Sequence, residues 1–197
     1  AAQGTGATAA TFLTTVPKVG ALVAVYRLMA MVSAGNESWL VVVAVLATAS
    51  MFLGNLAAYW QRDPRRLLGW STVSQVGFLL VPVAAAGRSD LALPSLLFYL
   101  AAYALTNVAA FAVTAALPEY RDLTAYRGLA RARPGLALAL LVALLGLVGT
   151  PPTAVFVGKL TTATAASSGA GAGAEAGVVA SLWSVMPALV RVGESVR

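Results

Sequence analysis

Cysteine and histidine are both absent from the 197-residue sequence, and only 10% of its residues are charged. Without thiols and imidazoles, the chain cannot form disulfides, use a thiolate, or bind haem and iron–sulfur clusters in the usual way. Most zinc sites are excluded for the same reason. We therefore expect no metal site, no cofactor-binding residue and no redox centre in this chain. A soluble domain carries about 25% charged residues, so the scarcity of charge also excludes an ordinary soluble protein.

The residues that are present indicate a protein embedded in a lipid bilayer. The chain is 59% hydrophobic, and its mean hydropathy is +0.83. A membrane-spanning helix needs about 20 apolar residues, so the length allows about six such helices. No segment alternates apolar and polar residues in the way that membrane barrel strands do. The sequence predicts an all-α, polytopic membrane helix bundle of about six transmembrane helices, one of them broken.

The apolar runs give the expected helices their limits. We expect five strong helices and a last, weaker one, over residues 7–32, 39–60, 64–86, 93–117, 134–162 and about 178–190. Residues 161–177 are rich in alanine, glycine, serine and threonine, and this composition is typical of a flexible connection. The first residue is not methionine, and we expect the sequence to be a fragment of a longer chain or a trimmed one.

The break is expected at Pro151 and Pro152. A straight helix over 134–162 would measure roughly 40 Å, which exceeds a hydrocarbon core of about 30 Å. Proline removes a backbone donor and clashes with the preceding turn, and broken backbone in lipid is tolerated only inside protein or beside a wet cavity. Lys159 follows the break, which favours a place on an ion path; a lysine that reaches the membrane surface is the alternative.

Lys18 lies near the middle of the first expected helix, with roughly 18 Å of helix on each side. Ionisable groups at such depth are costly and are usually functional. Thr14 and Thr15 precede it by four and three residues, so all three share a face. A structural lysine bonded to carbonyl groups, or a helix that sits higher in the membrane, remains the alternative.

Polar residues also gather in one half of the third and fourth helices, and this half is the one that leads to Lys18. They are Ser71, Ser74, Gln75, Tyr103 and Asn107, with Thr72, Tyr99, Thr106 and Thr114 beside them. Ordinary bonding between helices, worth about 0.6 kcal/mol per contact, explains any one of them. Three helices polar in the same half favour a hydrated half-channel, which we state as a hypothesis.

The charged residues orient the chain. Seven arginines lie in loops that would share one side of the membrane: Arg62, Arg65, Arg66, Arg121, Arg127, Arg131 and Arg133. Positive loops face the cytoplasm, so the first helix is expected to begin there. The net charge of +6 therefore does not indicate a nucleic-acid partner. All seven acids lie outside the expected helices, so the two lysines need a partner on another chain or in a missing part.

Several segments, in the same order along residues 7–165, resemble the antiporter-like membrane subunits of NADH-quinone oxidoreductase (respiratory complex I). They are Phe12-Leu13-Thr14-Thr15-Val16-Pro17-Lys18, Gly54-Asn55-Leu56, the run from Asp63 to Phe78, Tyr126-Arg127-Gly128-Leu129 and Gly149-Thr150-Pro151-Pro152-Thr153 with Gly158-Lys159. The Tyr-Arg-Gly-Leu segment favours the subunit N branch of this family.

The resemblance implies the C-terminal part of a fourteen-helix subunit built from inverted repeats. Residues 1–165 then form a partial antiporter-like proton-translocation domain, and 166–197 form a linker with a divergent last helix. Lys18 matches the central connecting lysine and Lys159 the channel lysine of the second repeat. The family commonly has lysine at Arg65 and histidine at Gln75; because glutamine cannot titrate, a proton-carrying role for Gln75 is not expected.

The resemblance also implies a function. The family's subunits couple quinone reduction to proton transfer, as a translocase, in the bacterial inner membrane. NADH, FMN, iron–sulfur clusters and quinone are expected on partner subunits, and other membrane subunits of complex I are the expected partners. Two alternatives stay open: a subunit of a multi-subunit monovalent cation/proton antiporter, and a scaffold subunit that moves no protons.

Overall fold

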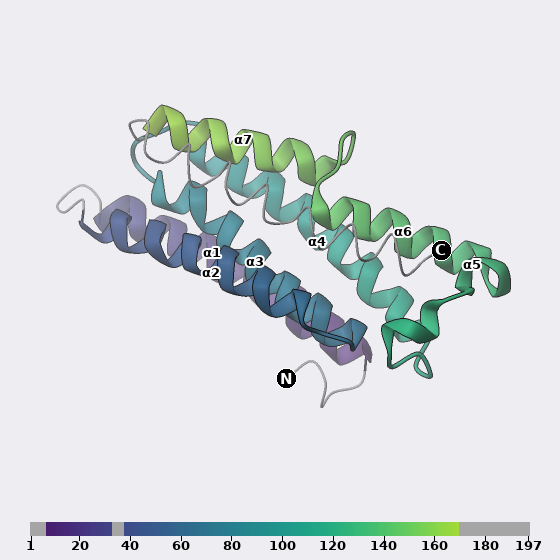
Figure 1. Cartoon of the computed structure of the whole chain (residues 1–197). Coiled ribbons are helices and arrows are strands. Elements are labelled where there is room, and N and C mark those ends of the chain that lie inside the picture. The colour runs from purple at the N-terminus through teal and green to yellow at the C-terminus, as the bar shows by residue number, and fades with distance from the viewer. Residues whose placement is uncertain (1–6, 33–37, 170–197) are drawn as a thin grey trace.

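The computed structural model describes residues 7–32 and 38–169, apart from several side chains near the start of the first helix, and what it describes is helices and their connections (Figure 1). The elements in chain order are α1 (Ala7–Val32), α2 (Ser38–Tyr59), α3 (Pro64–Ala84), α4 (Ala92–Ala116), the 3₁₀ turn η1 (Leu123–Tyr126), α5 (Leu129–Ala132), α6 (Pro134–Val148) and α7 (Ala154–Gly169). The all-α prediction is confirmed for this part of the chain.

The first four helices begin and end within two residues of the expected ranges. Local chemistry explains the start of α3, where the Asp63 carboxylate accepts a hydrogen bond of 2.8 Å from the backbone N–H of Arg65. Pro64 occupies the first turn, where its missing N–H costs nothing. In the described part of the chain, α1 to α4 are long and apolar enough to cross a membrane, and α6 is a shorter apolar helix.

The expected flexible connection is wrong for residues 161–169, which continue α7 instead. Hydroxyl groups of this segment bond back to their own helix: Thr161 donates to the Gly158 carbonyl at 2.9 Å, and Thr162 to the Lys159 carbonyl at 2.8 Å. Alanine favours the helix, and Ala165 is buried. The linker expected from residue 166 is therefore wrong for residues 166–169. The rest of it and the helix expected over 178–190 lie outside the described residues.

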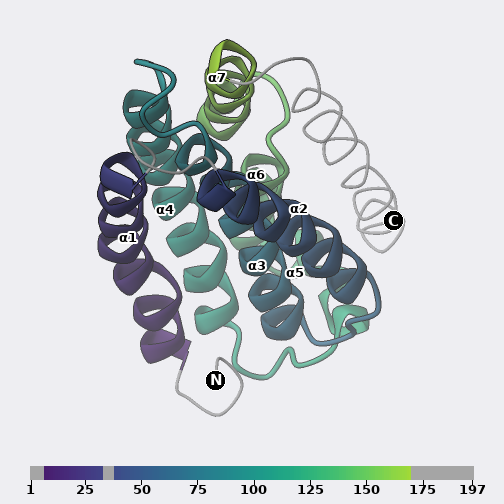
Figure 2. The same cartoon turned by 90° about the vertical axis from the view of Figure 1, so that its left-hand side faces the viewer.

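Helix α4 occupies the middle of the bundle and contacts α1, α3, α6 and α7. Figure 2 shows α4 beside α1, with α3 and α2 on its other side. Figure 1 shows α6 and α7 following one another along α4. The two halves of the broken helix therefore share one supporting helix.

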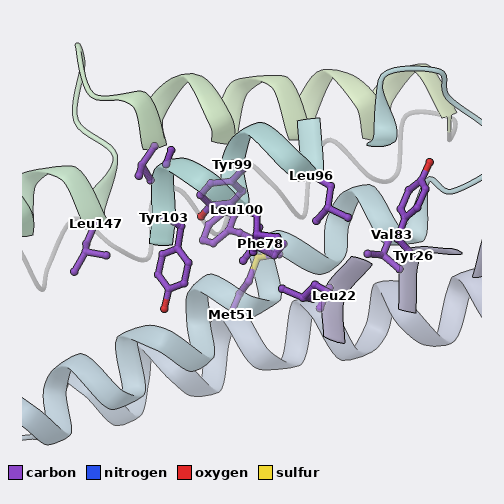
Figure 3. Close-up of a cluster of buried hydrophobic side chains, with 14 of the residues drawn as sticks. Leu22, Tyr26, Met51, Phe78, Val83, Leu96, Tyr99, Leu100, Tyr103 and Leu147 are labelled. Atoms are coloured by element: carbon purple, nitrogen blue, oxygen red, sulfur yellow. The ribbon is translucent and has the colours of Figure 1, made fainter. Parts of the chain in front are cut away.

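Close approach between these helices depends on small residues. A Cβ atom added at Gly54 would lie 2.5 Å from the Ser74 backbone nitrogen, and one at Gly158 would lie 3.0 Å from Tyr99 Cβ. Small residues allow membrane helices to pack in this way. Figure 3 shows the core that results, with Phe78, Tyr99 and Leu100 gathered where α3 and α4 meet.

Apolar and polar side chains are distributed as expected for a protein in lipid. Large apolar side chains are exposed on the outside, among them Val41, Leu53, Leu105 and Leu138. Polar side chains are buried inside, among them Thr72, Ser74, Gln75, Asn107 and Lys159. A soluble protein seldom exposes so much apolar surface, so this is a multi-pass membrane bundle whose apolar core also contains buried polar groups.

Candidate functional site

The helix break lies at residues 149–153, around Pro151 and Pro152, as the sequence predicts. Helix α6 ends at Val148 and is capped by Gly149, whose φ of 80° belongs to the left-handed region that glycine tolerates. The Gly149 N–H bonds to the carbonyls of Leu145 and Gly146, and the Thr150 N–H bonds to Leu145 as well. These bonds satisfy two of the last four carbonyls of α6.

The other two carbonyls at this end are bonded by side chains from different helices. Lys159 of α7 donates from Nζ to the Val148 carbonyl at 2.8 Å. Gln75 of α3 donates from Nε2 to the Leu147 carbonyl at 2.7 Å. An unpaired carbonyl inside a membrane is costly, and the last four carbonyls of a helix lack partners within it. The broken end of α6 is therefore fully capped, and Lys159 is part of the cap.

The Lys159 ammonium is surrounded by groups that favour positive charge without carrying negative charge. Its side chain is only 1% exposed, and Nζ lies 4.4 Å from the centre of the Phe78 ring. The aromatic face and the C-terminal end of α6 both attract a cation. No acidic side chain of the described helices acts on this ammonium. Lys159 thus points inward, unlike a lysine that reaches the membrane surface.

Gln75 is held at both ends of its amide. The Tyr99 hydroxyl donates to Gln75 Oε1, which leaves Nε2 directed at the Leu147 carbonyl. Tyr99 comes from α4, so this short chain of bonds ties α4, α3 and α6 together. Gln75 therefore lies at the site, next to Lys159, although it cannot change its charge.

A buried polar stripe runs along α4 from this point towards Lys18. Tyr99, Tyr103 and Asn107 follow at four-residue spacing, which places them on one helix face over roughly 12 Å. Asn107 Nδ2 donates to Thr15 Oγ1 at 3.1 Å and so joins α4 to α1. Lys18 is half-buried one turn after Thr15. The stripe brings Gln75, Tyr103, Asn107 and Thr15 into one series between the two lysines.

The Tyr103 hydroxyl is the least satisfied group of this stripe. It is buried and has no hydrogen-bond partner among the described residues. Thr72 lies close to it, but the Thr72 hydroxyl already donates to the Leu68 carbonyl at 2.8 Å, and the two hydroxyls make no well-directed bond.

Other expected site residues lie elsewhere or outside the description. Ser74 is buried against the backbone of Gly54 in α2, where it serves helix packing. Ser71 is half-buried on α3. Thr14 belongs to α1, but its side chain is outside the described part. The hydrated half-channel therefore stays a prediction.

Sequence reasoning missed one group that completes the site, Phe78, and named the other, Tyr99, only as one member of a polar helix face. Phe78 carries no sequence signal, because a buried phenylalanine in a membrane helix is ordinary. Tyr99 does have one, since it stands four residues before Tyr103. The carbonyls of Leu147 and Val148 could be expected to need partners beside a proline break, but the sequence does not say which.

Comparison with known proteins identifies the family. The family model described as "NADH:quinone oxidoreductase/Mrp antiporter, TM" matches residues 1–184. NADH-quinone oxidoreductase subunit N of Mycobacterium sp. (strain JLS) is 73% identical over 169 residues, a stretch that covers 86% of this chain and 36% of that protein. Subunit N 1 of Streptomyces griseus is 62% identical over 169 residues and is covered to the same extent, 36%. The chain thus spans only about a third of the length of these relatives.

Solved structures support the same relationship. The Mrp complex from Dietzia sp. DQ12-45-1b contains a chain that superposes with a TM-score of 0.86 at 27% identity, covering 97% of this chain and 36% of that one. Respiratory complex I from Thermus thermophilus contains one with a TM-score of 0.67 at 32% identity, covering 79% of this chain and 35% of that one. The chain belongs to the NADH:quinone oxidoreductase/Mrp antiporter transmembrane family.

Proposed function

We propose that this chain is the C-terminal part of subunit N of a bacterial NADH-quinone oxidoreductase, and that it translocates protons through Lys159 and Lys18. The redox chemistry takes place on partner subunits, which carry NADH, FMN, iron–sulfur clusters and quinone. The chain itself supplies buried groups that gain and lose protons. The 73% identity to a subunit N favours this complex over other members of the family.

One observation carries the proposal: the ammonium of Lys159 is buried at a helix break and bonded to a backbone carbonyl at 2.8 Å, and no acidic side chain among residues 7–32 and 38–169 lies beside it. A lysine paired with a carboxylate would be held in its charged form. A carbonyl and an aromatic ring hold the proton less firmly, because neither carries a full negative charge. Ionisable groups in such positions are typical of proton relays.

In this proposal Lys18 receives protons from the cytoplasmic side, along the polar residues Thr14, Thr15, Ser71 and Asn107. Lys159 passes them towards the opposite side. The arginine-bearing loops that would face the cytoplasm are joined at one end of the bundle, since the Leu123 N–H bonds to the Arg62 carbonyl at 2.9 Å. This placement supports an orientation in which α1 begins at the cytoplasmic side of the bacterial inner membrane.

A subunit of a monovalent cation/proton antiporter is the second candidate, and the superposition on the Mrp complex with a TM-score of 0.86 favours it. The two candidates differ in what drives the protons. Transport in complex I follows NADH oxidation, whereas transport in an antiporter follows a cation gradient. Sodium-dependent proton movement without NADH would support the antiporter.

The experiment measures proton pumping and NADH oxidation in inverted membrane vesicles that contain the intact complex. Lys159→Ala and Lys18→Ala are each expected to lower pumping by at least about tenfold, which corresponds to 1.4 kcal/mol in the rate-limiting step. Lys159→Arg is the matched variant, because it keeps a donor for the Val148 carbonyl but does not release its proton. It is expected to assemble normally and to pump as poorly as Lys159→Ala.

Removal of the charge of exposed Arg133, outside the membrane-spanning helices, serves as the control and should leave pumping within twofold of the wild type. If both lysine variants pump normally in an assembled complex, the proposal fails and the chain is a scaffold. If Lys159→Arg pumps normally, Lys159 acts as a fixed charge and does not carry the proton.

A further inference from the structure

The last two carbonyls of α6 have partners of different chemistry. Val148 is bonded by Lys159, whose proton leaves and returns in the proposed function. Leu147 is bonded by Gln75, whose amide keeps the same charge at every pH of interest. When Lys159 gives up its proton it has fewer hydrogens to donate, while the bond from Gln75 is unaffected. The Lys159–Val148 contact thus changes with the protonation of the lysine, whereas the Gln75–Leu147 contact does not.

The geometry leaves Gln75 little freedom to do anything else. Its oxygen accepts from the Tyr99 hydroxyl, so the amide nitrogen must face the Leu147 carbonyl, which it reaches at 2.7 Å. Gln75, Tyr99 and Leu147 are all buried, so water does not compete for these bonds. The interaction connects residues 72 positions apart in the sequence, and it ties the end of α6 to α3.

The same stretch of α3 also contacts the ammonium. Phe78 follows Gln75 by three residues, which places both on one face of the helix, and its ring centre lies 4.4 Å from Lys159 Nζ. Helix α3 therefore holds the Val148 end of α6 through Gln75 and faces the lysine through Phe78. If the end of α6 moved away from α3, the acceptor and the aromatic face would no longer surround the same ammonium.

We infer that Gln75 is a positioning residue for Lys159. It fixes the broken end of α6 against α3 through the Leu147 carbonyl, so that the Val148 carbonyl stays within reach whenever Lys159 holds its proton. The inference rests on the proposed function, since it assigns Gln75 a part in proton transfer at Lys159. It also explains how a residue that cannot titrate serves a site of this kind, because its task is to hold a carbonyl in place.

The test compares variants of Gln75 in the intact complex, by proton pumping in inverted vesicles and by the amount of assembled complex. Gln75→Leu removes the donor to Leu147. Gln75→His keeps one donor and one acceptor at a similar reach. Ser95→Ala is the matched control, because Ser95 is as buried as Gln75, at 4% exposed, and loses one hydrogen bond, to Ala92 within its own helix.

Gln75→Leu is expected to lower pumping about tenfold in an assembled complex, whereas Gln75→His keeps at least about half of it and Ser95→Ala stays at the wild-type level. Pumping within twofold of the wild type in Gln75→Leu overturns the inference, and so does an equal loss in Gln75→His. If the Gln75→Leu complex does not assemble, Gln75→Asn takes its place, since its shorter amide cannot span from Tyr99 to Leu147, and the same limits apply.

A second measurement separates positioning from a merely structural role. In a Lys159→Ala background there is no ammonium to position, so adding Gln75→Leu should leave the residual rate of NADH oxidation unchanged. A further fall shows that Gln75 acts independently of Lys159 and overturns the inference. Lys159→Ala alone tests the proposed function: if it lowers pumping while Gln75→Leu does not, only the role of Gln75 is refuted.

Discussion

Gly149→Ala is the substitution whose effect follows most directly from the structure. Gly149 has a φ of 80°, and a Cβ added there would lie 3.3 Å from Lys159 Cδ. An L-residue in the left-handed region costs about 1–2 kcal/mol. Leaving that region would redirect the chain after residue 149 and break two bonds to the Leu145 carbonyl, one from the Thr150 N–H and one from the Thr150 hydroxyl, both at 3.1 Å. Each is worth about 0.5–1.5 kcal/mol net. It would also shift α7 and pull Lys159 away from the Val148 carbonyl. The strained cap is therefore the cheaper state, and we expect residue 149 to keep its conformation.

Two measurable effects follow from this comparison. The complex should assemble, but thermal inactivation should occur at a lower temperature, by an amount that reflects a loss of roughly 1–2 kcal/mol in this subunit. The new methyl group should also push the Lys159 stem by a few tenths of an ångström, away from a Val148 bond that measures 2.8 Å. We expect this shift to lower the rate of pumping several-fold, which corresponds to raising the barrier of the rate-limiting step by about 1 kcal/mol.

Gly135→Ala in the same helix is the control. Gly135 lies near the start of α6, has an ordinary helical φ, and has no atom within 4 Å of an added Cβ. Alanine there should be neutral or should stabilise the helix by about 0.5–1 kcal/mol. The assay is pumping in inverted vesicles before and after heating. If Gly149→Ala survives heating and pumps as well as Gly135→Ala, then the strained cap does not control the position of Lys159, and the reasoning is refuted.

Two further predictions concern helix contacts and access. Gly158→Ala should lower the stability of the folded subunit by about 1–3 kcal/mol through overpacking, because the added Cβ would lie 3.0 Å from Tyr99 Cβ. Gly20→Ala is the control, because a Cβ added there has no atom within 4 Å. Equal heat stability of the two variants would contradict the contact at Gly158. Because the chain has no native cysteine, Ser71→Cys in the half-buried position should react with a thiol reagent added from the cytoplasmic side faster than Ser74→Cys, which is buried against Gly54. The reverse order would place the half-channel along α2 instead.

Local sequence features predict most of the helices. Apolar runs specify α1 to α4 to within two residues, because a bilayer requires spans of similar length whatever their neighbours are. The prolines at 151 and 152 specify the break, because the ring and the missing donor act within one turn. The limit of α7 was predicted wrongly, since residues 161–169 have the composition of a linker but bond their hydroxyls to their own backbone.

For the candidate site, too, the sequence predicts some features and the structure is needed for others. Lys18 and Lys159 stand out in the sequence because they are the only lysines of the chain and both lie in apolar helices. The place of Lys18 near the middle of its helix follows from residue counting, whereas the depth of Lys159 depends on how much chain the break takes up. The atoms that surround the two lysines cannot be predicted in this way, because hydrophobic periodicity shows which face of a helix is buried but not which residues of other helices pack against it.

The sequence by itself thus determined that the chain is a helical membrane protein, where its helix breaks, and which two lysines lie within apolar helices. The tertiary structure alone decided that the Lys159 ammonium lies between the Val148 carbonyl and the Phe78 ring. It also decided that Gln75 bonds to Leu147, 72 residues away. The physical reason is that helix formation and membrane insertion depend on neighbouring residues and on the solvent. The partners of a buried polar group depend instead on how separate helices pack, and here that packing is set by close contacts such as those at Gly54 and Gly158.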